Sequence, residues 1–219
     1  MQIFLDIDGV LADFYQAVAD LFRLSVDDLV SETAPADYNI ENALQRALLH
    51  YESVNFRYKQ DNLNFHDRSK EGIRKEMWSK ITRGGIEFWQ NIKLYPWAAA
   101  LRRLCIEYSS QDEVIFATSP AMCGESSAGK VRWIQQFAGY DCRNYLITPG
   151  NKHLLAKNKG CVLIDDSDIG VEMFTRFGGS AILFPQPWNQ NYGKAESSES
   201  RLRYVDEQLE ILKHTLPAF

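Results

Sequence analysis

The sequence lacks the patterns that mark cysteine-based metal sites, histidine metal sites and membrane spans. Its four cysteines form no CxxC pair, and Cys105 and Cys161 fall inside apolar runs. We therefore expect buried thiols rather than a zinc or disulfide framework. The four histidines show no metal-ligand spacing. The chain contains no run of 18 apolar residues, so no helical membrane span is expected.

Basic charge is also scarce. Lysine and arginine number 24 against 29 aspartates and glutamates, which gives a formal net charge of −5. Proteins that grip a nucleic-acid backbone usually carry a basic excess or a basic stripe, so polynucleotide binding is not expected. A small anionic substrate is compatible with this charge, because a local site can be cationic inside an acidic protein. The first ten residues, MQIFLDIDGV, interrupt the apolar stretch that a signal peptide needs, and we expect a cytoplasmic protein.

Five short apolar runs have the composition of buried parallel strands, because they are continuous rather than alternating. They cover residues 3–5, 114–117, 145–148, 161–164 and 181–184. Helical patterns lie between several of them, for instance over 97–108 and 130–137, and an amphipathic one follows over 200–216. Strands that alternate with helices form a parallel sheet covered on both faces. We therefore predict an α/β fold with a Rossmann-like parallel sheet core.

The stretch from residue 25 to residue 93 has a different character. It is polar and rich in helix formers, with helical patterns over 43–50 and 71–81 and no convincing strand. It separates the first expected strand from the second by far more than the dozen or so residues of an ordinary crossover. The simplest interpretation is a helical cap inserted into the α/β core.

The insertion suggests a division of the chain into two parts. We expect the core to comprise residues 1–15 and 94–219, and the inserted helical cap to comprise residues 16–93. The hinges between them are expected near Phe14–Gln16 and Ile92–Pro96.

Two carboxylates at the end of the first strand are the sharpest feature of the sequence. Asp6 and Asp8 follow an apolar run and precede Gly9. Alternation along a strand places both on the same side, beyond the carboxyl end of the sheet, where functional residues of open α/β sheets collect. Two close carboxylates repel each other unless a cation neutralises them, and such oxygen ligands suit Mg²⁺. The alternative is a turn whose solvated aspartates cap the next helix.

Two later strands also end in polar residues. Thr118 and Ser119 follow the second expected strand, where a hydroxyl beside free backbone N–H groups can contact a phosphate, although a simple turn has the same composition. Asp165 and Asp166 follow the run over 161–164. An acidic cluster is commonly a solvated turn, but a second acid-tipped strand beside the first would complete a carboxylate cage for a divalent metal.

A lysine is the fourth candidate. Lys152 follows a short strand and precedes Asp165, and a cation there could offset the charge of the carboxylates and of a transferred phosphoryl group. Lys157 and Lys159 are nearby rivals for this position.

In this order, Asp6-Ile7-Asp8, Thr118, Lys152 and Asp165-Asp166 resemble the four motifs of the haloacid dehalogenase superfamily of phosphohydrolases. Further segments are similar to one branch, the 5'(3')-deoxyribonucleotidases. These segments are Asp8–Phe14, Phe88–Asn91, Thr118–Pro120, the helix that carries Lys130 and Trp133, and Phe184–Asn189.

The resemblance implies a role for each candidate residue. Asp6 would be the nucleophile that forms an aspartyl-phosphate, and Asp8 would be the general acid and base. Mg²⁺ would be held by Asp6, the backbone carbonyl of Asp8 and Asp166, with Asp165 in support. The phosphoryl oxygens would be held by Thr118, Ser119, Lys152 and the backbone N–H groups at Gly9 and Val10. A nucleobase would stack on Phe14, Phe88 and Trp89, which could equally be core residues of the seam between cap and core.

The resemblance therefore implies a Mg²⁺-dependent phosphatase that acts on nucleoside monophosphates, with deoxyribonucleotides favoured. Two other functions are compatible with the sequence. One is a phosphatase of the same fold that acts on another small phosphomonoester or on a nucleic-acid 3'-phosphate. The other is a catalytically idle binding protein, against which the presence of both Asp6 and Asp8 argues.

Overall fold

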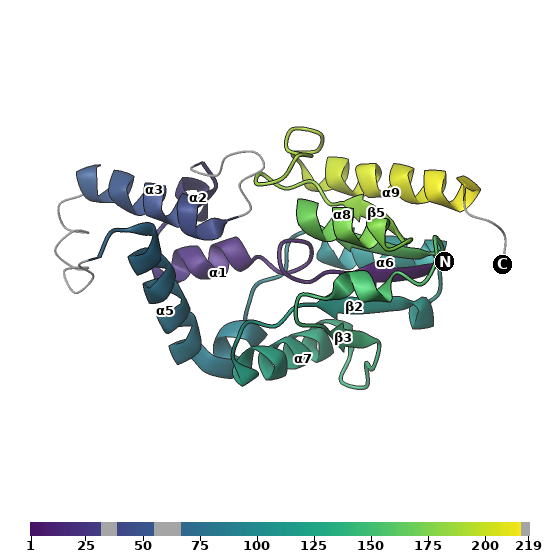
Figure 1. The fold of residues 1–219 in the computed structure, drawn as a ribbon, viewed down its shortest axis with the longest axis horizontal. Helices are drawn as coiled ribbons and strands as arrows, with labels where there is room; N and C mark the ends of the chain where they lie inside the picture. Colours follow the sequence, from purple (N-terminus) through teal and green to yellow (C-terminus); the bar gives the residue numbers. More distant parts are fainter. Residues whose placement is uncertain (32–38, 55–66, 216–219) are drawn as a thin grey trace.

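A five-stranded parallel sheet lies at the centre of the computed structural model (Figure 1), which describes residues 1–31, 39–54 and 67–215. The strand order is β3-β2-β1-β4-β5. The strands are β1 (Gln2–Leu5), β2 (Val114–Thr118), β3 (Tyr145–Ile147), β4 (Cys161–Asp165) and β5 (Ser180–Leu183). All five lie on the apolar runs that predicted them, and the expected α/β class with a Rossmann-like sheet is confirmed.

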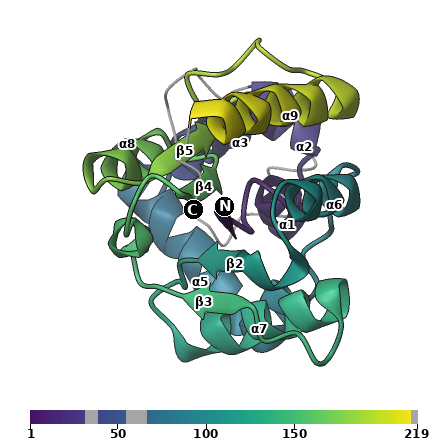
Figure 2. The ribbon, with the colours of Figure 1, turned by 90° about the vertical axis from the view of Figure 1, so that its right-hand side faces the viewer.

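Helices cover both faces of this sheet, as Figure 2 shows from its end. Alternate residues of β1 decide which helices pack where: Ile3 and Leu5 belong to the large core, whereas Phe4 packs on the opposite face against Phe174. The large core includes residues of α6 (Ala98–Tyr108), α7 (Gly124–Ala138) and α9 (Ser198–Thr215). The opposite face carries α8 (Asp168–Arg176) and the short 3₁₀ helix η2 (Lys152–Leu155), and a second such turn, η1 (Gln111–Glu113), precedes β2.

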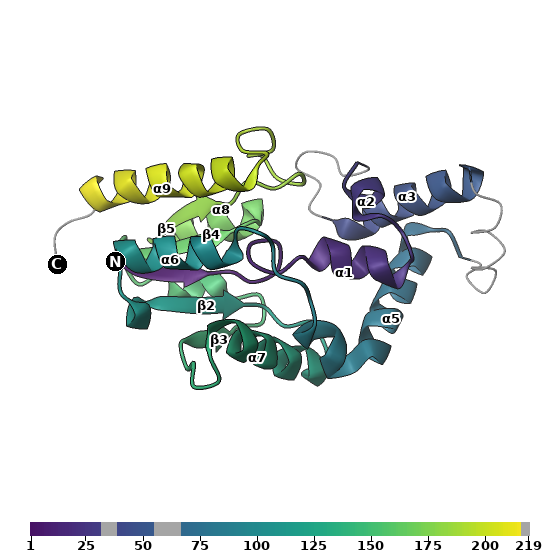
Figure 3. The same ribbon diagram turned by 180° about the vertical axis from the view of Figure 1, so that it is seen from behind.

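The remaining helices lie beyond the carboxyl ends of the strands (Figures 1 and 3). They are α1 (Phe14–Leu21), α2 (Val26–Ser31), α3 (Ile40–Val54) and α5 (Lys70–Gln90). The helical patterns over 43–50 and 71–81 fall within α3 and α5. Two stretches of the expected cap, 32–38 and 55–66, lie outside the described residues. The division into a core and a cap at residues 15 and 94 stays a prediction.

Two short linkers connect the helical segment with the sheet and run side by side. The backbone N–H of Asp13 donates to the carbonyl of Lys93 at 2.8 Å, and that of Tyr95 donates to the carbonyl of Leu11 at 2.9 Å. The outgoing linker ends at Asp13, whose side chain caps α1 by accepting from the N–H of Gln16. The hinges expected near Phe14–Gln16 and Ile92–Pro96 stay predictions; the first overlaps the start of α1 and the second overlaps the return linker.

The end of α5 packs closely on α7, and a glycine makes this approach possible. A Cβ at Gly129 would collide with the Cβ of Trp89 and would lie 2.8 Å from the carbonyl oxygen of Ile86. Close by, the indole N–H of Trp133 donates to the carbonyl of Ile92 at 2.8 Å. The helical segment is thus joined to the α/β core at this helix pair as well as at the two linkers.

The predictions about cysteines and about membrane-spanning helices can be compared with the structure. The four cysteines lie within the described residues as free thiols, and Cys105 and Cys161 are buried as predicted. Burial raises the pKa of the Cys105 thiol to about 12, which removes its reactivity at neutral pH. Within the part of the chain that the structure describes, no helix combines the length and apolarity needed to cross a membrane.

The contact at Gly129 gives a first prediction. Gly129→Ala should lower the free energy of unfolding by about 1–3 kcal/mol, the usual cost of overpacking a filled site. Gly124→Ala on the same helix is the matched control, because nothing lies within 4 Å of a Cβ at that position and alanine restricts the unfolded chain. Urea denaturation of both variants measures the difference. Equal stabilities would show that the α5–α7 packing is looser than described.

Candidate active site

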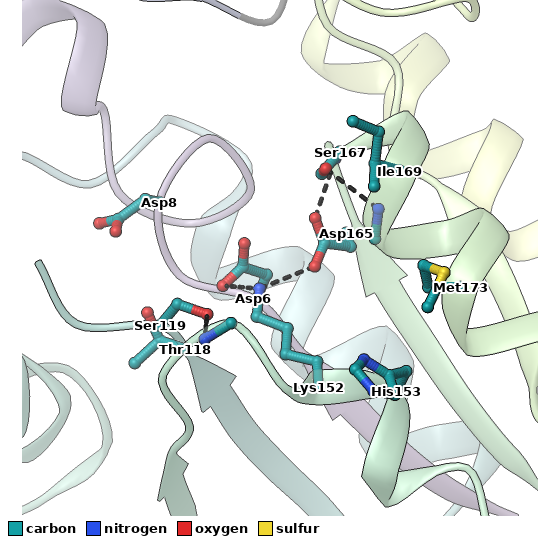
Figure 4. A pocket seen from close by; sticks show the side chains of 12 residues that line it. Asp6, Asp8, Thr118, Ser119, Lys152, His153, Asp165, Ser167, Ile169 and Met173 are labelled. Carbon is teal, nitrogen blue, oxygen red and sulfur yellow. Dashed lines mark hydrogen bonds and ion pairs between the residues drawn. The ribbon is translucent and has the colours of Figure 1, made fainter. Parts of the chain in front are cut away.

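Polar residues from three adjacent strands meet at the carboxyl edge of the sheet. Because β1 lies between β2 and β4, Asp6, which follows β1, stands between Thr118 at the end of β2 and Asp165 at the end of β4. These residues line one cavity of about 300 Å³ (Figure 4). Its remaining lining residues are Asp8, Ser119, Gly150, Lys152, His153, Ser167, Ile169, Gly170 and Met173. The convergence expected from the acid-tipped strands is therefore present.

Three buried carboxylates and one lysine form the centre of this site. Oxygens of Asp6, Asp165 and Asp166 lie within 4.8 Å of one another. The ammonium of Lys152 lies 2.7 Å from Asp6 Oδ1 and 2.7 Å from Asp165 Oδ2. One positive charge thus faces three negative ones in a region shielded from water, where uncompensated charge is costly.

The pKa values of these groups follow from that imbalance. Burial raises the pKa of Asp6 to about 7; Asp165 and Asp8 add to the rise and Lys152 opposes it. Burial, followed by Asp165 and Asp6, raises the pKa of Asp166 well above its ordinary value. Burial lowers the pKa of Lys152, but the two carboxylates beside it outweigh this effect and raise it. A further cation would stabilise the ionised form of the three acids.

Hydrogen bonds satisfy only one of the two carboxylate oxygens of Asp166 within the described part of the chain. Its Oδ2 accepts from the indole N–H of Trp188 at 2.7 Å, and its backbone carbonyl accepts from Asn189 at 2.9 Å. Its Oδ1 is buried and has no hydrogen-bond partner among the described residues. Asp165, by contrast, accepts from Lys152 through one oxygen and from the N–H of Ser167 through the other. An unsatisfied oxygen beside other carboxylates fits a divalent cation that prefers oxygen ligands, such as Mg²⁺.

Gly9 does not line the cavity, but it leaves the room that the carboxylate of Asp166 occupies. Its φ is 77°, a region that favours glycine, and an added Cβ would overlap the carboxylate of Asp166. The side-chain amide of Gln186 donates to the backbone carbonyl of Gly9. The loop that carries Gln186, Trp188 and Asn189 was not assigned to the site from the sequence, where only its likeness to a late loop of the family was visible.

Asp8 stands apart from the three clustered acids (Figure 4). Its carboxylate contributes no oxygen to their group and instead pairs with the ammonium of Lys130. The same ammonium donates to Thr118 Oγ1 at 2.9 Å and to the carbonyl of Ser119 at 2.5 Å. Lys130 was not among the predicted site residues. The available signal was its place on the buried face of a helix, three residues before Trp133.

The structure distinguishes between the rival lysines. Lys152, on η2, lines the cavity, whereas Lys157 and Lys159 are exposed. Thr118 is buried at the end of β2, and Ser119 accepts from the N–H of Gly150 at 3.3 Å. Both hydroxyl groups therefore border the same cavity as Lys152.

The three predicted aromatic residues lie together but do not line this cavity. Phe14 stacks on Trp89 with 5.8 Å between ring centroids, and Phe88 meets both rings edge-on. Trp89 is buried, and its ring lies 5.1 Å from the ammonium of Lys130. The trio forms part of the seam between the helical segment and the core. Its contact with a substrate stays a prediction.

Comparison with known proteins gives a limited result. No protein-family model matches the sequence, and no curated protein matches it. Among solved structures, the fold is similar to a HAD family hydrolase from Deinococcus radiodurans R1 with bound phosphate and sodium (TM-score 0.45, 11% identity, 82% of this chain and 78% of that chain). It is also similar to a phosphonoacetaldehyde hydrolase-like protein from Oleispira antarctica (TM-score 0.45, 14% identity, 97% of this chain and 84% of that chain). At these values the similarity concerns the chain trace and not the chemistry.

The three carboxylates give a second prediction. Without metal, at pH 8, Asp166→Asn should raise the free energy of unfolding by about 1 kcal/mol. Burial and the neighbouring acids raise the pKa of Asp166 in the folded state, which costs stability above the ordinary carboxyl pKa, whereas the amide is neutral and its oxygen still accepts from Trp188. With Mg²⁺ the order should reverse, since a ligand that binds only the folded state adds about 2.7 kcal/mol at 100 times its Kd. Urea denaturation with and without MgCl₂ measures both effects.

The matched control is Asp112→Asn, which removes one exposed negative charge on η1, before β2. It should leave the response to Mg²⁺ unchanged. An undiminished Mg²⁺ response in Asp166→Asn would contradict the assignment of Asp166 as a metal ligand.

Proposed function

We propose that the protein is a Mg²⁺-dependent phosphomonoesterase in which Asp6 is the nucleophile. The observation that supports this proposal is the position of the Asp6 carboxylate. It lies at the end of β1, against the ammonium of Lys152 and within 4.8 Å of oxygens of Asp165 and Asp166. A phosphate monoester is anionic and repels an attacking carboxylate, so catalysis needs positive charge beside the nucleophile, of which Lys152 supplies part and a bound cation would supply the rest.

The reaction would proceed in two steps. In the first, an Asp6 oxygen attacks phosphorus, the bond to the leaving oxygen breaks, and Asp8 gives that oxygen a proton. In the second, Asp8 takes a proton from water, whose oxygen attacks phosphorus and releases Asp6 and inorganic phosphate. Thr118, Ser119 and Lys152 would hold the phosphoryl oxygens from the side of the cavity that they line.

The residues present fit the proposed metal. Asp6 and Asp166 would hold Mg²⁺ with their side chains, together with the backbone carbonyl of Asp8, and Asp165 would support them through Lys152 and Ser167. When bound, the cation supplies charge that offsets the repulsion between the Asp6 carboxylate and the ester.

We further propose that the substrate is a nucleoside monophosphate, with deoxyribonucleotides favoured by the family resemblance. The aromatic trio of Phe14, Phe88 and Trp89 supports this part, because Trp89 adjoins Lys130, which in turn holds Asp8. A leaving group that takes its proton from Asp8 would therefore lie near aromatic rings, on which a base stacks with about 1–3 kcal/mol.

A substrate panel tests the function. Phosphate release is measured from nucleoside monophosphates, sugar phosphates, 4-nitrophenyl phosphate and a 3'-phosphorylated oligonucleotide, each with MgCl₂ and with EDTA. The proposal expects metal-dependent turnover and the highest kcat/KM for a nucleotide. A preference for sugar phosphates would remove the nucleotide assignment, and no turnover of any ester would remove the enzyme.

Replacing the nucleophile gives the third prediction. Asp6→Asn should abolish turnover on every ester of the panel, because the amide cannot form the phosphorylated intermediate. The fold should persist, since the replacement has the same shape and removes one of the repelling charges. Phosphate release and thermal unfolding of the same preparation are the two measurements. Activity retained in Asp6→Asn would refute this residue as the nucleophile.

The rival lysines give the fourth prediction. Lys152→Ala should lower kcat by at least about 10²-fold, the scale for the loss of one contact to the transition state. Lys157→Ala is the matched control on an exposed neighbour and should leave kcat unchanged. The reverse result would show that the lysine of the third motif has been misassigned.

A further inference from the structure

A second lysine, outside the four motifs, is buried at the edge of the site. Lys130 lies on α7, is 2% exposed, and reaches across to the loops that follow β1 and β2. A buried lysine is rare unless it is fully paired. Lys130 makes three polar contacts, to the carboxylate of Asp8, the hydroxyl of Thr118 and the carbonyl of Ser119.

The number of these contacts decides what Lys130 can do. An ammonium group has three N–H donors and no acceptor. Asp8, Thr118 and Ser119 account for all three donors, so none is left for a phosphoryl oxygen. Lys130 therefore differs from Lys152, which lines the cavity directly. Its influence on a substrate must pass through the groups that it holds.

The three donors of Lys130 also determine how its partners Thr118 and Asp8 are oriented. Because the ammonium can only donate, Thr118 Oγ1 accepts, and the hydroxyl hydrogen of Thr118 is directed to another acceptor, such as a phosphoryl oxygen in the cavity that it lines. Asp8 accepts through Oδ2, which leaves Oδ1 without a partner among the described residues. One cation thus orients a phosphate donor and the proposed proton-transfer group together.

We propose that Lys130 is a positioning residue that holds Asp8 for proton transfer to the leaving group. This inference rests on the proposed function. Trp89 completes the arrangement, because its ring lies 5.1 Å from the ammonium on the lysine side of the pair, where the side chain is only 3% exposed. The Asp8 side chain is 26% exposed and lines the cavity. An ion pair whose cation is buried is stronger than one that is fully exposed.

A double-mutant cycle tests the coupling between Lys130 and Asp8. Lys130→Met, which keeps the length of the side chain, should lower kcat/KM about 10²-fold for the alkyl phosphate that the wild type hydrolyses fastest. The double variant Lys130→Met/Asp8→Asn should be no slower than Asp8→Asn alone, within about threefold, because both changes remove the same proton transfer. Losses that multiply would overturn the inference, since a residue that acts only on stability or on the phosphate would add its own cost.

Dependence on the leaving group gives a second readout that a structural role would not change. 4-Nitrophenolate leaves without a proton, so the loss of kcat/KM in Lys130→Met should be at least about ten times smaller for 4-nitrophenyl phosphate than for the alkyl ester. Equal losses on both esters would also overturn the inference.

Two further variants serve as safeguards. Lys130→Gln keeps hydrogen-bond donors at the site, so it is measured in the same way in case Lys130→Met does not fold. Arg132→Met, an exposed change on the same helix whose partner is Gln90, should behave as wild type on both esters. A wild-type chain that hydrolyses neither ester overturns the proposed function and this assignment with it, whereas independent losses in an active enzyme overturn the assignment alone.

Discussion

The electrostatic imbalance at the carboxyl edge of the sheet is the constraint on which the rest of the site depends. Asp6, Asp165 and Asp166 are buried together, and Lys152 supplies only one positive charge to them. Such a cluster persists because the surrounding structure fixes each carboxylate separately: β1 and β4 place them side by side, and Trp188 and Asn189 hold Asp166. The glycine at position 9 leaves room for that carboxylate. Gathering these charges costs free energy, and a bound cation would offset that cost.

Two lysines form ion pairs with the carboxylates of the site, and they lie in different layers of the fold. Lys152 approaches from η2 and pairs with Asp6 and Asp165, which places it beside the proposed nucleophile. Lys130 approaches from α7 and pairs with Asp8. The proposed nucleophile and the proposed acid–base group, only two residues apart in the sequence, are thereby held by separate cations. This separation gives the two carboxylates different surroundings, which is the condition for giving them different chemical roles.

The sequence predicted the features that follow from local pattern. Apolar runs located all five strands, and acidic residues at two strand ends predicted that Asp6 and Asp165 would meet, because parallel strands present their carboxyl ends at one edge. Features that depend on tertiary packing could not be predicted from the sequence. The pattern of α7 indicates that Lys130 lies on the buried face of the helix. It does not identify the partner of Lys130, which is Asp8, 122 residues away in the sequence. The same holds for Trp188, whose indole reaches Asp166 across 22 residues.

The helical segment contributes to this chemistry through a narrow set of contacts. It is tied to the core by the paired linkers at Asp13 and Lys93, by the packing of α5 on α7 at Gly129, and by the ring of Tyr15 on α1, which stacks on Trp188 with 4.0 Å between centroids. The second tie carries Trp89, whose ring covers the ammonium that holds Asp8. Asp6 and Lys152, in contrast, lie on the sheet and η2, and no contact described here connects them directly to α5. A displacement of α5 relative to α7 would therefore disturb the environment of the proposed acid–base group more than that of the proposed nucleophile, whereas a displacement of α1 would act on Asp166 through Trp188.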